Sequence, residues 1–371
     1  MSTKLTLILA FVISVAITSC GKTETEIAAM NYARTNHTAT LLDSGSVLIA
    51  GGYQTNNIIL SSAELYNPTT GLFATTGSMN DVRFGHTSTL LMDGKVLITG
   101  GLSSNNTVLA SAETYDPATG IFTKVGSMNS ARFYHTATIL DDGTVLIAGG
   151  YQTNDVYLSS AEIYDPATGA FTSISPLNTA RYSHTATMLS NGNVLIAGGI
   201  RGGNSLTNAE LFDPGTKTFT ATVSMKTARY AHTATALDNG RVLIAGGYST
   251  GVISNAELYD TATNVFLNIN AMTSARNYYT ATLLNSGEVL IAGGTSDNYK
   301  SLSSAEVYNP NLGTFTNITT MKNTRNNHTA TVLADGTVLV AGGVDENIGS
   351  LASAEIYDPS TGIFTAVPAH N

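Results

Sequence analysis

Short apolar or threonine-rich runs alternate with polar turns along most of the chain, and residues 128–176 show the whole pattern once. The four runs lie at 135–140, 145–148, 160–164 and 171–174. Asp142-Gly143 stands between the first two runs, where Asp-Gly is a strong signal for a tight hairpin turn. Residues 165–169, Asp-Pro-Ala-Thr-Gly, are a second turn signal, because proline fixes φ and glycine tolerates positive φ. The stretch therefore predicts a four-stranded antiparallel meander.

The same pattern returns seven times with a period of about 49 residues. Each copy begins with an arginine before its first run, ends its second run at a glycine pair and has a glutamate in its third run. The arginines stand at 34, 83, 132, 181, 229, 276 and 325, the glycine pairs begin at 51, 100, 149, 198, 246, 293 and 342, and the glutamates stand at 64, 113, 162, 210, 257, 306 and 355. The predicted repeats are approximately 30–78, 79–127, 128–176, 177–224, 225–271, 272–320 and 321–371. A period near 50 residues is typical of propellers rather than of helical solenoids.

Seven four-stranded units, with no helix outside the N-terminal segment, predict an all-β fold: a seven-bladed β-propeller of antiparallel blades around a channel. No unit can bury its apolar faces alone, so residues 30–371 are expected to form one domain. The run that begins His-Thr-Ala-Thr is expected to be the innermost strand, because its small side chains suit the narrow end of each blade. This places Thr136 and Thr138 at the channel.

Every copy also has two aromatic residues seven positions apart. They are Tyr66 and Phe73, Tyr115 and Phe122, Tyr164 and Phe171, Phe212 and Phe219, Tyr259 and Phe266, Tyr308 and Phe315, and Tyr357 and Phe364. A glycine pair followed by such an aromatic pair resembles the kelch repeat, and the resemblance covers residues 30–371. The second aromatic is usually Trp in kelch repeats, whereas it is Phe in all seven copies here and the chain has no Trp. The resemblance implies a smaller packing slot in the same fold.

Residues 1–19 have the composition of an export signal. Lys4 supplies a positive start, and Leu5–Ile17 is an apolar run too short for a comfortable membrane span. Residues 18–21, Thr-Ser-Cys-Gly, span the end of this segment and resemble a bacterial lipoprotein signal, and Cys20 is the only cysteine in the chain. The resemblance implies that Cys20 is acylated and that residues 20–29 tether the protein to a membrane of the bacterial cell envelope. An ordinary secretory signal with an incidental cysteine is the alternative.

Charge excludes one class of partner. Charged residues make up 12% of the chain, and seven of the 17 Lys and Arg are the repeated arginines. The net charge is -9 and no cluster of Lys and Arg occurs. Because nucleic-acid binding needs a basic surface, we expect no nucleic-acid partner. We separately expect the protein to be a monomer.

The repeated Arg, His and Glu allow two interpretations. They are acid–base or anion-binding groups at the channel, or each Arg pairs with a Glu to build its blade. The equal numbers, seven arginines and seven glutamates, favour pairing, since an unpaired buried charge costs several kcal/mol.

The histidines occur once per copy at 37, 86, 135, 184, 232 and 328, with Tyr279 in the sixth copy, so they lack the local spacing of a zinc site. We assign structural roles to Arg132, His135, Gly149, Gly150, Glu162, Tyr164, Phe171 and their equivalents, and expect no metal and no cofactor.

Enzymes with similar folds can be compared by residue. Copper radical oxidases resembling galactose oxidase need a cysteine cross-linked to tyrosine, and the one cysteine here is Cys20. Sialidases contain Ser-x-Asp-x-Gly-x-x-Trp boxes, which this chain cannot form without Trp. A carbohydrate-active enzyme stays open as an alternative, such as a sugar epimerase or mutarotase resembling the kelch-type sialic acid epimerase. The charged, non-repeated residues that it would need are Arg201, Asp297, Lys300, Asp345 and Glu346.

The copies differ most in the loops after the glycine pairs and in the connections between copies, which we expect to open on one face of the ring. Tyr gives a large contact area at low entropy cost, and Asn and Ser adapt their hydrogen bonds. These segments therefore predict a recognition surface for a glycan or a protein, with ordinary solvated loops as the alternative. The candidate binding residues are Tyr53, Phe133, Tyr134, Tyr151, Tyr182, Arg201, Tyr230, Tyr248, Tyr278, Asp297, Tyr299 and Asp345, and Phe84 lies in the same connections. The main prediction is an exported, lipid-anchored binding or scaffold module without catalytic residues.

Overall fold

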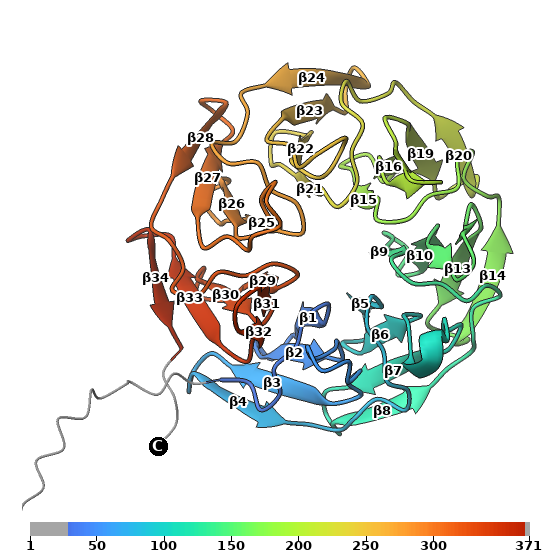
Figure 1. Ribbon diagram of the computed structural model, residues 1–371. Coiled ribbons are helices and arrows are strands. Elements are labelled where there is room, and N and C mark those ends of the chain that lie inside the picture. The colour runs from blue at the N-terminus through green and yellow to red at the C-terminus, as the bar shows by residue number, and fades with distance from the viewer. Residues whose placement is uncertain (1–28, 368–371) are drawn as a thin grey trace, which may run out of the picture.

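The structure, a computed structural model, describes residues 29–367 as seven four-stranded antiparallel sheets around a central axis (Figure 1). The predicted all-β, seven-bladed propeller is therefore confirmed. Blade one consists of β1 to β4, and the other six follow in chain order. The innermost strands, which adjoin one another around the axis, are β1 (Thr38–Leu41), β5 (Thr87–Leu90), β9 (Thr136–Ile139), β15 (Thr185–Met188), β21 (Thr233–Ala236), β25 (Thr280–Leu283) and β29 (Thr329–Val332).

The remaining strands of each blade follow outward from the axis. The second strands are β2 (Val47–Ala50), β6 (Val96–Thr99), β10 (Val145–Ala148), β16 (Val194–Ala197), β22 (Arg241–Ala245), β26 (Val289–Ala292) and β30 (Val338–Ala341). The third strands are β3 (Ala63–Asn67), β7 (Ala112–Asp116), β13 (Ala161–Asp165), β19 (Ala209–Asp213), β23 (Ala256–Asp260), β27 (Ala305–Asn309) and β33 (Ala354–Asp358). The outer strands are β4 (Leu72–Thr75), β8 (Ile121–Lys124), β14 (Ala170–Ile174), β20 (Thr218–Ala221), β24 (Val265–Ile269), β28 (Thr314–Asn317) and β34 (Ile363–Ala366).

Four loops after the glycine pairs have regular structure of their own. Three form two-stranded ribbons: β11 (Tyr151–Gln152) with β12 (Val156–Tyr157), β17 (Ile200–Arg201) with β18 (Asn204–Ser205), and β31 (Val344–Asp345) with β32 (Gly349–Ser350). The loop of blade two contains a short 3-10 turn, η1 (Ser104–Asn106). These loops and the connections between blades open together on one side of the ring, which we call the loop face.

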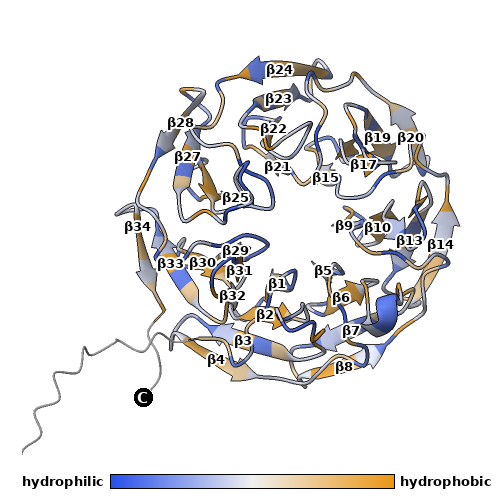
Figure 2. Ribbon diagram, in the orientation of Figure 1, coloured by the Kyte–Doolittle hydropathy of each residue, from blue (hydrophilic) through white to orange (hydrophobic). Residues whose placement is uncertain are grey.

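The core lies between the blades. The second strands are buried and almost entirely apolar, as in Val145–Ala148, because each of their faces packs against a neighbouring sheet; the polar exceptions are half-buried Arg241 and buried Thr99. In one such layer, Leu146 of blade three packs with Val194 and Phe212 of blade four. Figure 2 shows the apolar colouring of second strands such as β6 and β10. Burial on both faces explains why these four-residue runs are continuously apolar rather than alternating.

The repeated aromatic pair joins the third strand of each blade to its outer strand. Tyr164 on β13 stands directly opposite Phe171 on β14, with ring centroids 4.8 Å apart and the rings tilted by 46°. The same cross-strand contact occurs in all seven blades at 4.7–4.9 Å. Such pairs are worth about 0.5–1.5 kcal/mol beyond the area that they bury. They hold the outermost strand, which has a neighbour on one side only.

The glycine pair allows adjacent blades to approach closely. Gly149 has φ of 63°, and a Cβ built on it would lie 2.6 Å from the Arg181 carbonyl oxygen and 2.8 Å from Cε1 of His184, both in blade four. Gly150 has φ of 107° and donates its N–H to the same carbonyl oxygen at 2.8 Å. A side chain at position 149 would force the blades apart.

We expect Gly149→Ala to destabilise the protein by about 1–3 kcal/mol more than Gly169→Ala, because only position 149 is overpacked by a methyl group. Gly169 is a matched control, since its φ of 68° imposes similar backbone strain and a Cβ there would meet nothing closer than 4.0 Å. Chemical denaturation of both variants measures the difference. Equal losses would show that positive φ alone selects glycine at position 149.

The ring closes between blades seven and one by the contacts that join the other blades. Gly343 donates its N–H to the carbonyl oxygen of Arg34 at 2.9 Å, and a Cβ on Gly342 would lie 2.6 Å from Cε1 of His37. All four strands of blade seven come from the last repeat, and Ala29 forms a single bridge with Ser353. The predicted signal peptide at 1–19 and the lipidation site at Cys20 lie outside the described residues. Within 29–367 no helix is long and apolar enough to cross a membrane.

Candidate ligand-binding face

Each repeated arginine is buried in an ion pair with the glutamate of its own blade. Nη2 of Arg132 lies 2.8 Å from Oε1 of Glu162, and the two side chains are 0% and 1% exposed. Arg132 Nη1 also donates to the carbonyl oxygens of Gly149 and Ser160, and Glu162 accepts from the backbone N–H of Asn129 at 2.7 Å. Burial lowers the pKa of Arg132, and the charge of Glu162 opposes that shift. All seven pairs are 2.7–2.9 Å long. Nη1, Nη2 and both carboxylate oxygens are bonded within the blade. Nε of Arg34, Arg83, Arg229, Arg276 and Arg325 has no partner among the described residues, but it is buried, so the pairs offer little to a ligand.

The histidines form a closed ring of side-chain contacts between inner strands. His184 Nε2 lies 3.0 Å from the Thr136 hydroxyl of the preceding blade, and its pKa is lowered to about 3 by burial, reinforced by the positive charges of Arg181 and Arg132. In blade six Tyr279 replaces histidine, accepts from the Thr233 hydroxyl and donates to the Ala245 carbonyl oxygen. The seven contacts are His37–Thr329, His86–Thr38, His135–Thr87, His184–Thr136, His232–Thr185, Tyr279–Thr233 and His328–Thr280. His and Tyr at this position are both neutral and both hydrogen-bond to the threonine of the preceding blade.

A second closed ring, of backbone hydrogen bonds, surrounds the axis at the loop face. The residue before each histidine, or before Tyr279, donates its N–H to the carbonyl oxygen of the equivalent residue one blade back, at 2.9–3.3 Å. All seven have φ of 49–60°, including the candidates Tyr134 and Tyr278. The members are Asn36, Gly85, Tyr134, Ser183, Ala231, Tyr278 and Asn327. Burial raises the pKa of Tyr278 to about 12, so its hydroxyl is a neutral donor at the channel mouth.

Aromatic candidate residues gather on the loop face over blades three and four. The ring centroid of Tyr151 lies 5.3 Å from that of Phe133 and 5.0 Å from that of Tyr182. Phe133 continues to Tyr134 at 4.9 Å, and Tyr157, which sequence reasoning did not select, lies 5.4 Å from Tyr151. Each of these loops pairs with the connection beside it, as in the backbone bridge between Phe133 and Tyr151. This pairing brings the rings of the two segments together. We call these five rings the aromatic ladder.

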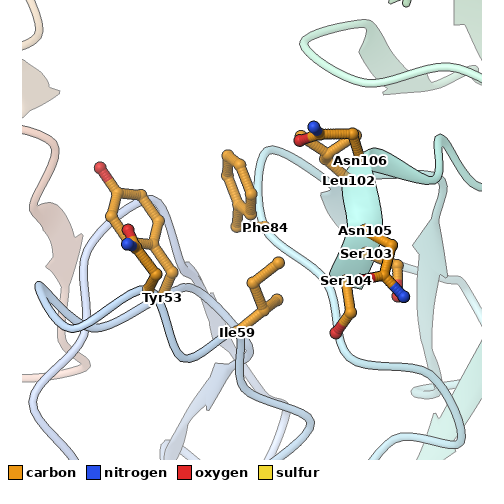
Figure 3. Close-up of a pocket in the computed structure, with 9 residues that line it drawn as sticks. Tyr53, Ile59, Phe84, Leu102, Ser103, Ser104, Asn105 and Asn106 are labelled. Atoms are coloured by element: carbon orange, nitrogen blue, oxygen red, sulfur yellow. The ribbon is translucent and has the colours of Figure 1, made fainter.

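Two further aromatic pairs lie outside the ladder. Tyr230 and Tyr248 pair in blade five at 5.4 Å, and Tyr53 of blade one lies 4.9 Å from Phe84 of blade two at an angle of 60°. The second pair forms one wall of a cavity of about 560 Å³ between the loops of blades one and two (Figure 3). We call this cavity the blade one–two cleft. Its other wall is the segment Ser103–Asn106, and Asn57, Ile59 and Leu102 complete the lining.

Comparison with known proteins identifies the fold family. A family model described as "Attractin/LZTR1 beta-propeller" matches residues 17–208, just over half of the 371 residues. The chain belongs to this beta-propeller family. Kelch motifs match at residues 276–322 and 325–371, which confirms the kelch resemblance drawn from the glycine and aromatic pairs.

The kelch propeller also resembles solved structures. One, described as a novel fungal alcohol oxidase with catalytic diversity among the AA5 family in complex with copper, has 20% sequence identity and a TM-score of 0.71. The likeness covers 88% of this chain and 75% of the oxidase, and at that identity it shows the fold alone. No curated protein matches the sequence.

The charged candidates of the kelch propeller, and the neighbouring Tyr299, do not come together at the axis. Asp345 is buried and accepts hydrogen bonds from Thr324 and from the backbone N–H of Asn347, so it shapes its own loop. Glu346 accepts from the backbone N–H of Ser301. Arg201, Asp297, Tyr299 and Lys300 are exposed on the loops of blades four and six. None of these six residues lines the axial cavity of about 260 Å³, and within 29–367 no group of three or more His, Cys, Asp or Glu is arranged to hold a metal ion.

Sequence reasoning missed the loop of blade two, Leu102–Asn106. It has Leu where blades one, three and five have Tyr after the glycine pair, so it lacks the aromatic signal used to select the other loops. Its run Ser-Ser-Asn-Asn is ordinary turn composition. The signal that would have found it is positional, because this loop adjoins Phe84 at a bridge between Phe84 and Leu102.

Proposed function

We propose that this kelch propeller is an exported, lipid-anchored binding module that recognises carbohydrate through its loop face. The observation that carries the proposal is the asymmetry of that face. The repeated Arg and Glu are paired within the blades, whereas the non-repeated loops and the connections of blades one to five together present Tyr and Phe beside Asn and Ser. Rigidly mounted aromatic rings with adaptable amides suit recognition, and a concave cleft suits a small glycan better than a flat protein surface.

Export and anchoring are supported by the N-terminal sequence. The apolar run and the single cysteine at position 20 fit a lipoprotein signal in the bacterial cell envelope. Two or more acyl chains give stable anchoring, whereas a single chain binds reversibly. We expect Cys20→Ser to move the protein from the membrane fraction to the soluble fraction. A variant that stays with the membranes would contradict acylation at Cys20.

A glycan array tests the binding proposal directly. The purified full chain is expected to bind a subset of immobilised glycans, and each bound glycan is then incubated with the protein and analysed for a change in structure. Binding without turnover supports a binding module. Turnover would instead assign a carbohydrate-active enzyme, and an array without any bound glycan would overturn carbohydrate recognition in favour of a protein partner or a scaffold.

A further inference from the structure

We infer that the blade one–two cleft binds one neutral sugar ring of the recognised glycan. This inference rests on the proposed carbohydrate function and adds to it a site and a ligand class. Its volume of about 560 Å³ lies within the usual range of small-molecule sites. Its two walls differ in chemistry, and the inference follows from that difference.

One wall is aromatic and shaped as a corner. Tyr53 and Phe84 lie 4.9 Å apart with their planes inclined at 60°, and Ile59 and Leu102 extend the apolar surface beside them (Figure 3). Two rings at this angle leave no parallel slot for a flat aromatic ligand. A saturated pyranose ring has an apolar face of C–H groups that can lie on one ring, and a C–H edge that can meet the other. The corner therefore favours a puckered sugar over a planar base.

The facing wall is polar and unoccupied. Within residues 29–367, the side chains of Ser103, Ser104, Asn105 and Asn106 make no hydrogen bond to another residue, and neither does that of Asn57 across the cleft. Some polar side chains in other loops are used internally, since Gln152 donates to the Ala131 carbonyl oxygen and Ser205 donates to that of Tyr248. Hydroxyl and amide groups supply both donors and acceptors, which matches the vicinal hydroxyl groups of a sugar.

Charge limits the ligand class. No Lys, Arg, Asp, Glu or His lines the cleft. An anionic sugar would bring its carboxylate against apolar and neutral groups without a counter-charge, which is costly when water is excluded. Hydroxyl groups of a neutral sugar, in contrast, can exchange hydrogen bonds with the facing amides and hydroxyl groups. The cleft therefore fits a neutral hexose or N-acetylhexosamine better than a sialic or uronic acid.

Backbone contacts fix both walls before a ligand arrives. Phe84 and Leu102 exchange backbone hydrogen bonds of 3.1 and 2.8 Å, and Ser103 donates its N–H to the Thr107 carbonyl oxygen at 2.8 Å. Asn105 and Asn106 both have φ of 57°, which holds their side chains on a tight turn. A site formed in advance loses less entropy on binding.

Two variants each remove part of one wall. Phe84→Thr deletes the ring at a position where the first repeat already has Thr35, and the double variant N105G/N106G deletes the amides while glycine keeps the positive φ. Asn154→Gly in blade three, whose φ is 64°, is the matched control, and Phe133→Thr at the position equivalent to Phe84 tests the aromatic ladder as the alternative site. Each protein is tested for binding to an array of neutral, sialylated and uronic acid glycans, and melting temperatures establish that it is folded.

We expect the wild-type chain to bind neutral glycans, with Phe84→Thr and N105G/N106G each weakening binding at least tenfold and Asn154→Gly changing it less than twofold. Neutral binding that survives both cleft variants but is lost in Phe133→Thr would overturn the cleft as the site and leave carbohydrate binding intact, through the aromatic ladder. Binding restricted to acidic glycans would overturn the neutral ligand class. If no glycan binds to any folded protein, the proposed function itself fails.

Discussion

Arg132→Ala is expected to lower the free energy of unfolding by about 3–5 kcal/mol, because it leaves Glu162 buried without its cation. Glu162 is 1% exposed, and its remaining partners are Asn129 and the backbone N–H of Ser130. The variant also leaves the carbonyl oxygens of Gly149 and Ser160 without the donor that they now share. Urea denaturation measures the loss, and glycan binding by the fraction that remains folded is expected to be retained.

A double variant separates the buried charge from the packing. Arg132→Met combined with Glu162→Gln removes both charges and keeps a carbonyl acceptor for the Asn129 N–H, so it is expected to lose less stability than Arg132→Ala alone. Arg229 and Glu257 form an equivalent pair in blade five and allow the comparison to be repeated. If Arg132→Ala stays folded and abolishes binding, the pair has a ligand-binding role and the structural assignment is wrong.

The fold could be predicted from the sequence because each unit is built in the same way. A turn of Asp, Asn or Ser followed by Gly, the glycine pair and the aromatic pair occur at nearly fixed offsets in every copy. A wrong assignment in one copy would therefore conflict with the other six. The close packing of Gly149 against His184 could not be predicted, since it joins two blades through atoms 35 residues apart in sequence. The same holds for the ring of backbone hydrogen bonds that includes Tyr134 and Tyr278.

The binding face was predicted less completely, and for a physical reason. Aromatic residues are easy to notice in a sequence, so most residues of the aromatic ladder were predicted as binding residues. Asn105 and Asn106 were not, because asparagine is common in turns. Position relative to the repeat is more informative than residue type. The residue after each repeated arginine is aromatic in blades two to five, at Phe84, Phe133, Tyr182 and Tyr230, and polar in the other three, at Thr35, Asn277 and Asn326. The loop face is therefore divided into an aromatic arc and a polar arc, and the blade one–two cleft lies where the two meet.

Acid is expected to unfold this propeller between about pH 4 and 6, because six neutral histidines must be protonated when the chain unfolds. Burial lowers the pKa of His86, His184 and His328 to about 3 and that of His37, His135 and His232 well below 6.5. In the unfolded chain the same rings titrate near 6.5. Their contribution to stability is thus complete above about pH 6.5 and is lost as the pH falls towards 3.

The magnitude follows from the number of protons taken up on unfolding. Each histidine changes stability by about 1.4 kcal/mol per pH unit within this window, so six together give about 8 kcal/mol per unit, enough to remove a typical stability of 5–15 kcal/mol within about two units. Tyrosine is a suitable replacement for a control variant, because Tyr279 makes the same contact with a threonine as the histidines do. Burial raises the pKa of Tyr279 to about 12, so its side chain stays neutral. His184→Tyr should therefore reduce the slope of unfolding free energy against pH by about one proton, and adding His135→Tyr should reduce it by a second. Denaturant titrations from pH 4.5 to 7.5 measure the slope, and an unchanged slope in both variants would place the source of the acid sensitivity outside the histidine ring.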